Sequence, residues 1–145
     1  MASIAGLLLT VWTLFQAKAA ASTAREVKAR MFSLDTLSEL SAAITLLGEV
    51  KTLQRLAAWD LVLDRYGHVR RHLVRIANLN DQLSPAHLAE VAWALNQFRT
   101  MEKKLESSRS AVARDTIDPA KYNEIVSKGI EKLESVMIAI KKVGI

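Results

Sequence analysis

The chain has 145 residues, half of them hydrophobic, and carries 20 Lys and Arg against 15 Asp and Glu, a net charge of +5. This hydrophobic content excludes a disordered chain, and the length corresponds to one domain. Because cysteine is absent, a disulfide framework and a thiolate metal site are excluded, which fits a reducing cytoplasm.

The N-terminal segment is the feature that constrains function most. Residues 1–17 carry no charged side chain, and alanine-rich residues 19–24 follow Lys18. A helix that spans a bilayer needs about 20 mostly apolar residues, and residues 2–24 would reach roughly 34 Å as a helix. We therefore predict a membrane anchor, a transmembrane helix, at residues 1–24 and a stalk at residues 25–33.

The charges that follow the anchor predict its orientation. Lys18, Arg25, Lys28 and Arg30 stand against the single anion Glu26. Cationic flanks stay on the cytoplasmic side, so we expect a single-pass protein of the inner membrane with the bulk of the chain in the cytoplasm.

Two other interpretations of the segment stay open. Residues 17–19 fit a signal-peptide cleavage site, although no basic residue precedes the apolar run. The second interpretation is that the segment forms a helix buried in a protein core or a protein interface. The run begins so close to the first residue that an earlier natural start is also open.

The rest of the chain predicts helices and no strand. Apolar residues three and four apart predict helices over 34–56, which could also continue the stalk, and over 59–78. Ser84-Pro85 and Asp118-Pro119 are strong helix starts, because Ser or Asp caps the helix and Pro fits its first turn. They predict helices over 85–114 and from residue 119 onward.

These elements define an all-α fold: an N-terminal apolar helix followed by an elongated antiparallel helical bundle over residues 34–145. The last helix carries a heptad pattern typical of a coiled coil, with Gly129 on the seam, where a missing side chain allows close contact. The predicted core positions are Leu37, Leu40, Ile44, Leu47, Val50 and Leu53, then Trp59, Val62, Tyr66, Val69, Leu73 and Ile76, then Leu88, Val91, Leu95, Phe98 and Leu105, and finally Tyr122, Ile125, Gly129, Leu133, Val136, Ile140 and Val143.

The densest basic cluster lies on the predicted helix over 59–78. Arg65, Arg70, Arg71 and Arg75 are candidates for an anionic ligand such as a lipid headgroup, a nucleotide or nucleic acid. Nucleic acid is not favoured, because exposed aromatic residues are not interleaved with the arginines. The other interpretation is a solvated helix face, which is what a run of charges on a helix usually forms.

Two histidines in the same helix are weak candidates for a metal site. His68 and His72 are four residues apart, so both point the same way, and Asp60 and Asp64 extend the column. The surrounding arginines oppose a bound cation, and the Glu that metalloproteases place after the first His is absent. We expect no metal and no cofactor.

No nucleophile constellation or phosphate-binding glycine loop is visible, so we expect no enzyme. The layout resembles small bacterial single-span proteins with a helical cytoplasmic part. We expect a membrane-anchored interaction or scaffold module that self-associates as a homo-oligomer or docks a helical protein partner. The alternative is a soluble oligomeric bundle that binds an anionic ligand through the arginine cluster.

Overall fold

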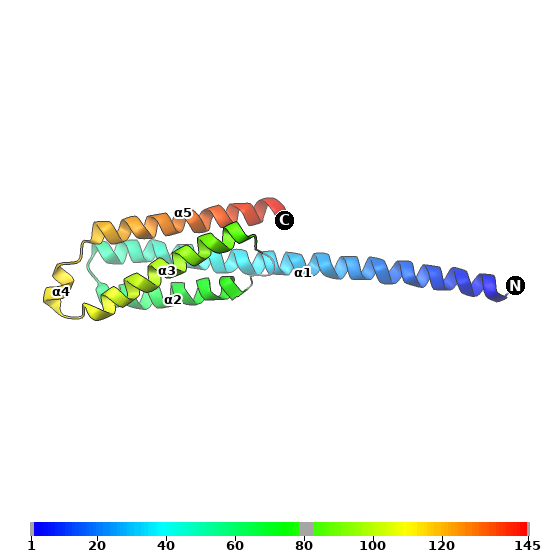
Figure 1. Ribbon diagram of the computed structural model, residues 1–145, viewed down its shortest axis with the longest axis horizontal. Helices are drawn as coiled ribbons and strands as arrows, with labels where there is room; N and C mark the ends of the chain where they lie inside the picture. Colours follow the sequence, from blue (N-terminus) through cyan, green and yellow to red (C-terminus); the bar gives the residue numbers. More distant parts are fainter. Residues whose placement is uncertain (1, 79–82, 145) are drawn as a thin grey trace.

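The computed structural model describes residues 2–78 and 83–144, with side chains from residue 8 onward except those of residues 111, 143 and 144. Every element in this part of the chain is a helix, which confirms the all-α prediction. Figure 1 shows a helical bundle from which one long helix projects toward the N-terminus. The C-terminal end of the chain lies near the point where that helix leaves the bundle (Figure 1).

The projecting helix α1 spans Ala2–Arg55 without interruption. The helix predicted over 34–56 therefore continues the stalk. Within the residues whose side chains are described, no helix is long and apolar enough to cross a membrane, so the structure does not support the predicted span. The first seven residues of the predicted anchor, 1–7, lie outside those described side chains.

The bundle has an up-down-up-down arrangement. Its other long helices are α2 (Trp59–Asn78), α3 (Pro85–Ser107) and α5 (Pro119–Gly144). Helix α1 packs against α2 and α5, and α3 packs against the same two helices from the other side. Short connections make sequential helices antiparallel, as in simple four-helix bundles.

The connection from α3 to α5 differs from the prediction. Helix α3 ends at Ser107 rather than near residue 114, and a short helix α4 (Ala111–Asp115) follows. Ser110 caps α4 by accepting a hydrogen bond from the Ala113 amide, and such a cap starts a new helix instead of extending the old one. Ser84 caps α3 in the same way from the His87 amide, as its sequence predicts.

The turn between α1 and α2 contains an alanine in the left-handed region. Ala57 has a φ of 54°. The Ala58 amide donates to the Leu53 carbonyl and the Ala57 amide to the Gln54 carbonyl, the two bonds of a Schellman motif. Glycine usually occupies this position. Residues 56–58 contain neither Gly nor Pro, so the turn lacks its usual sequence signal.

The core agrees with the prediction most closely in α2, where all six predicted positions are buried. In α1 the buried line is shifted, because small and polar residues occupy part of it. Leu37, Ile44 and Leu53 are only partly buried. The buried positions of α1 are Ser33, Thr36, Leu40, Ala43, Leu47, Val50 and Gln54.

Helices α3 and α5 approach closely at the predicted glycine, Gly129. A Cβ placed on Gly129 would lie 2.5 Å from Cζ of Phe98, so the ring occupies the space of the missing side chain. The Phe98 ring also stacks on the Tyr66 ring, with ring centroids 5.8 Å apart. Three helices are therefore held in one register by these residues.

Candidate functional site

The basic cluster of α2 lies along the seams where α2 meets α1 and α3. Arg65 donates to Glu49 of α1 at 3.0 Å and to Asp64 at 2.9 Å. Arg70 donates to Glu102 of α3 at 3.3 Å. The cluster thus supplies interhelical ion pairs, each worth about 0–1 kcal/mol at a protein surface.

Glu39 of α1 interacts with two basic side chains of α2. It forms an ion pair with His72 and accepts a hydrogen bond from Arg75 at 3.2 Å. Burial works to raise the pKa of Glu39, but hydrogen bonds from His72 and Arg75 and their positive charge outweigh it and lower that pKa below its ordinary value. Glu39 therefore stays ionised and joins α1 to α2.

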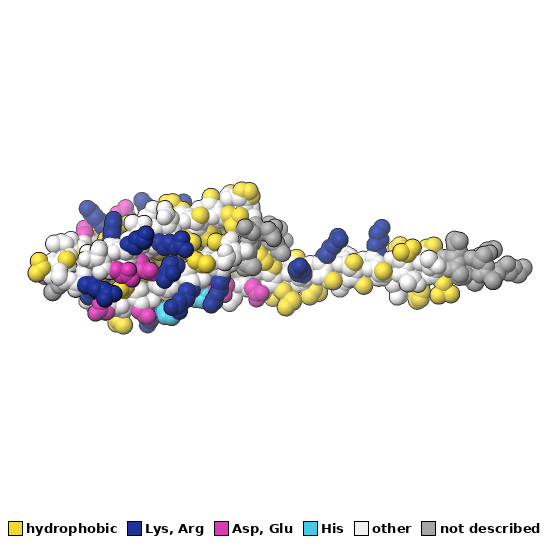
Figure 2. Space-filling model, turned by 60° about the horizontal axis from the view of Figure 1, so that its bottom comes forward, with side chains coloured by type: hydrophobic (Ala, Val, Ile, Leu, Met, Phe, Trp, Pro, Cys, Tyr) yellow, Lys and Arg dark blue, Asp and Glu magenta, His cyan; other side chains and the backbone are white. Residues whose placement is uncertain are grey.

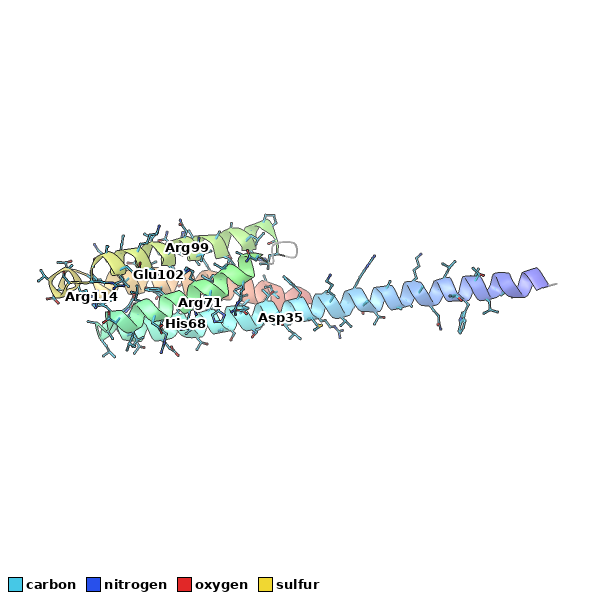
Figure 3. The ribbon with its side chains drawn as sticks, turned by 90° about the horizontal axis from the view of Figure 1, so that it is seen from below. Asp35, His68, Arg71, Arg99, Glu102 and Arg114 are labelled. Carbon is cyan, nitrogen blue, oxygen red and sulfur yellow. The ribbon has the colours of Figure 1, made fainter. Side chains whose placement is uncertain are left out.

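Arg71 is the member of the cluster without an ion pair in the described part of the chain, and its side chain is exposed. Figure 3 shows Arg71 on α2 and Arg99 on the neighbouring helix α3, along the same side of the bundle. Over this surface, basic side chains alternate with acidic ones and histidines (Figure 2). Of the four predicted arginines, Arg71 has the most charge available for an anionic ligand.

The predicted column of metal ligands is divided among other partners. His68 lies 3.6 Å from Asp64, His72 pairs with Glu39 of another helix, and Asp60 accepts a hydrogen bond from Arg114 at 2.8 Å. That hydrogen bond and the Arg114 charge lower the pKa of Asp60. Among the described residues, no group of three or more potential ligands gathers around one point.

A network of hydrogen-bonded polar side chains, buried at Tyr66 and Gln54, joins α1, α2 and α5. The sequence did not reveal this network. The Tyr66 hydroxyl donates to Oε1 of Gln54 at 2.6 Å, and Nε2 of Gln54 donates to Oδ1 of Asn123 at 2.6 Å. Asn123 donates in turn to the Lys51 carbonyl at 3.3 Å. Burial raises the pKa of Tyr66, so the hydroxyl stays protonated. The polar groups of Tyr66, Gln54 and Asn123 satisfy one another's hydrogen bonds. This network therefore helps to set the register of the three helices.

The projecting part of α1 carries the largest exposed apolar surface. Between residues 8 and 15 six large hydrophobic side chains are each more than half exposed: Leu8, Leu9, Val11, Trp12, Leu14 and Phe15. Helical geometry spreads these positions over roughly 220° of the circumference, and Thr10 and Thr13 occupy the remaining arc. An apolar arc this wide exceeds the stripe of about 100° that a surface helix buries against a core, and it is typical of burial in a bilayer or in a large protein core.

Comparisons with protein-family models, curated proteins and solved structures give no match.

Proposed function

We propose that the chain is a non-enzymatic, membrane-anchored helical interaction module, with the N-terminal part of α1 in the bilayer. The observation that carries the proposal is the wide exposed apolar surface over residues 8–15, where Phe15 is 75% exposed. Exposing this much apolar surface to water costs free energy in proportion to its area. Inserting the segment into lipid removes that cost.

The residues that follow fit a segment leaving the membrane. Lys18, Arg25, Lys28 and Arg30 form a cationic flank next to the apolar stretch, and such a flank favours the cytoplasmic face with its anionic lipids. Helix α1 continues through the flank without a break. From Arg25 to Ser33, where the bundle begins, the helical stalk measures about 12 Å.

The bundle itself supports an interaction role. Its interior is filled by apolar side chains, and the buried Tyr66–Gln54–Asn123 chain satisfies its own polar groups. In the proposed module the bundle is displayed at a fixed distance from the inner membrane face. Its partner is either a second copy or a helical protein.

The test is fractionation of the full chain followed by a carbonate wash. Wild-type protein is expected in the washed membrane pellet. Leu8→Arg/Leu14→Arg should move it to the soluble fraction, because each Arg near the centre of a span costs about 2.5 to 3.5 kcal/mol. The matched control is Ala29→Arg/Thr52→Arg, which adds the same two charges at exposed positions of α1 beyond residue 24 and should remain in the pellet. Wild-type protein that is soluble and monomeric without detergent contradicts the proposal.

The second candidate function is binding of an anionic surface through the arginine cluster, favoured by the exposed side chain of Arg71. In the Leu8→Arg/Leu14→Arg background, Arg71→Glu should weaken co-sedimentation with phosphatidylserine vesicles. The loss should shrink as salt rises, since exposed charges are screened beyond roughly 8 Å at physiological ionic strength. Sedimentation that Arg71→Glu leaves unchanged at low salt contradicts this function.

A further inference from the structure

Helix α1 carries two separate lines of small and apolar residues. The first faces the bundle from Ser33 to Gln54 and is buried by α2 and α5. The second, which we call the spacer line, lies on roughly the opposite side of the helix, because its positions are about half a turn away. The spacer line consists of Ala17, Ala20, Ala24, Val27, Met31 and Leu34.

The spacer line is exposed in the single chain. Val27, Met31 and Leu34 are 51%, 61% and 58% exposed, and the three alanines are exposed as well. This part of α1 projects away from the other helices (Figure 1). The spacer line differs from the bundle-facing line of α1. Continued toward the N-terminus, the bundle-facing line holds Ala19, Ser22, Glu26 and Ala29 and no large apolar residue.

The spacing of the line is that of a coiled coil. Its members alternate steps of three and four residues over 17–34, the repeat that supercoils two helices. The five charged residues of this stretch, Lys18, Arg25, Glu26, Lys28 and Arg30, all lie off the line. A charge-free seam with charges beside and behind it is typical of a helix that pairs with another helix.

We propose that the occupant of the spacer line is a second copy of this chain, packed in parallel and in register as a two-stranded coiled coil. This inference names the partner of the proposed module. It rests on the proposed function for one point, that both N-terminal segments enter the same bilayer. Each residue of the line then meets its own counterpart on the other copy.

Charge complementarity selects the parallel arrangement. In a parallel pair, residues flanking the seam contact residues five positions later on the other copy. Arg30 and Asp35 stand in this relation, so two Arg30–Asp35 pairs form across the dimer. Both side chains are exposed, and neither has an ion pair within the described part of its own chain. The dimer supplies the partner that each lacks.

The bundles leave room for this contact to continue. Beyond Leu34 the same face of α1 carries only small side chains, at Ser38, Ser41, Thr45 and Gly48. A Cβ at Gly48 would meet nothing within 4 Å, so the surface there is open. Two bundles can lie side by side along α1 without displacing large side chains.

The test uses single cysteines in the full chain, which has none of its own. In vesicles or detergent, Leu34→Cys and Met31→Cys should each give disulfide-linked dimers on mild oxidation. Ser22→Cys and Ala29→Cys lie off the line and serve as matched controls that should stay monomeric. Equal cross-linking at all four positions, or none at Leu34 and Met31, overturns the proposal.

A mixed sample tests the orientation. Chains with Ala17→Cys and chains with Leu34→Cys carry tags of different mass. Cross-links between the two kinds of chain would place residue 17 opposite residue 34, which occurs only in an antiparallel dimer and overturns the proposal. The parallel dimer gives homodimeric cross-links alone.

Further variants test the apolar seam and the Arg30–Asp35 pairs separately. Val27→Asp should abolish the Leu34→Cys cross-link, while Ala29→Asp leaves it intact and neither changes the melting of the bundle. Arg30→Asp should raise the dimer dissociation constant about tenfold, because two attractive pairs become repulsive, and adding Asp35→Arg should restore it. Failure of the double variant to restore dimerisation overturns the parallel pairing.

Failure of this inference can be told from failure of the proposed function. Washed membranes that retain a chain whose cysteines never cross-link contradict the dimer alone. A soluble chain with specific Leu34→Cys cross-links contradicts the anchor alone.

Discussion

Replacing Gly129 by alanine tests the packing at the centre of the bundle. The new Cβ would lie 2.5 Å from Cζ and 3.2 Å from Cε2 of Phe98. The ring cannot retreat freely, because it stacks on the fully buried Tyr66. Overpacking of this kind costs about 1–3 kcal/mol, whereas alanine in place of glycine inside a helix gains about 1 kcal/mol. We expect a net loss of up to about 2 kcal/mol.

The chain contains matched controls for this variant. Gly48 and Gly67 are also inside helices, and a Cβ at either meets nothing within 4 Å. Gly48→Ala and Gly67→Ala should therefore each stabilise the fold by about 1 kcal/mol, through helix propensity alone. Thermal unfolding followed by circular dichroism measures the difference, with about 4 °C expected per kcal/mol for a domain of this size.

The opposite sign would refute the reasoning. If Gly129→Ala raises the melting temperature as much as Gly48→Ala, the Phe98 ring moves aside and the contact does not fix the register. Gly129→Ala with Phe98→Leu should recover part of the loss, because the shorter side chain removes the clash. A double variant less stable than both single variants would contradict that explanation.

Three other predictions concern stability. Tyr66→Phe should cost about 1–3 kcal/mol in chemical denaturation, because it leaves the buried Oε1 of Gln54 without its donor; an unchanged midpoint would contradict this. Ala57→Gly should stabilise by about 0.5 to 1 kcal/mol, since glycine adopts the φ of 54° without strain, and a lower melting temperature would count against the turn. The lowered pKa of Glu39 means that its stabilisation is present above its ordinary pKa of 4.5 and is lost as pH falls through the lower folded value. Glu39→Gln should therefore make the melting temperature less dependent on pH in that acid range, and an unaltered acid profile would refute the assignment.

The sequence predicted those parts of the fold in which one helix face is uniformly apolar. Helix α2 is the clearest example, because its six buried residues are all large and apolar and its other face is charged. The start of α3 was also predictable, since Ser84 and Pro85 are local signals. The core line of α1 was not, because Ser33, Thr36 and Gln54 are buried through contacts with distant helices, which no pattern of hydrophobicity reveals.

The sequence predicts which arginines form the candidate site, but it does not predict which residues they pair with. The cluster of arginines on α2 is plain in the sequence, but its partners Glu39, Glu49 and Glu102 lie 16 to 36 residues away, on α1 and α3. Gln54 and Asn123 likewise meet Tyr66 only in the folded bundle. Such pairs depend on helix register, which is set by packing across the whole core.

Labelling of single cysteines in lipid vesicles tests the central claim, that the N-terminal part of α1 lies in a bilayer. The full chain is reconstituted with Leu14→Cys or with Ala29→Cys and exposed on both sides to a charged maleimide; the natural chain gives no background because it lacks cysteine. If the segment lies in the bilayer, Ala29→Cys should react at once and Leu14→Cys should react only after detergent is added. Equal reaction of the two cysteines in intact vesicles would contradict it.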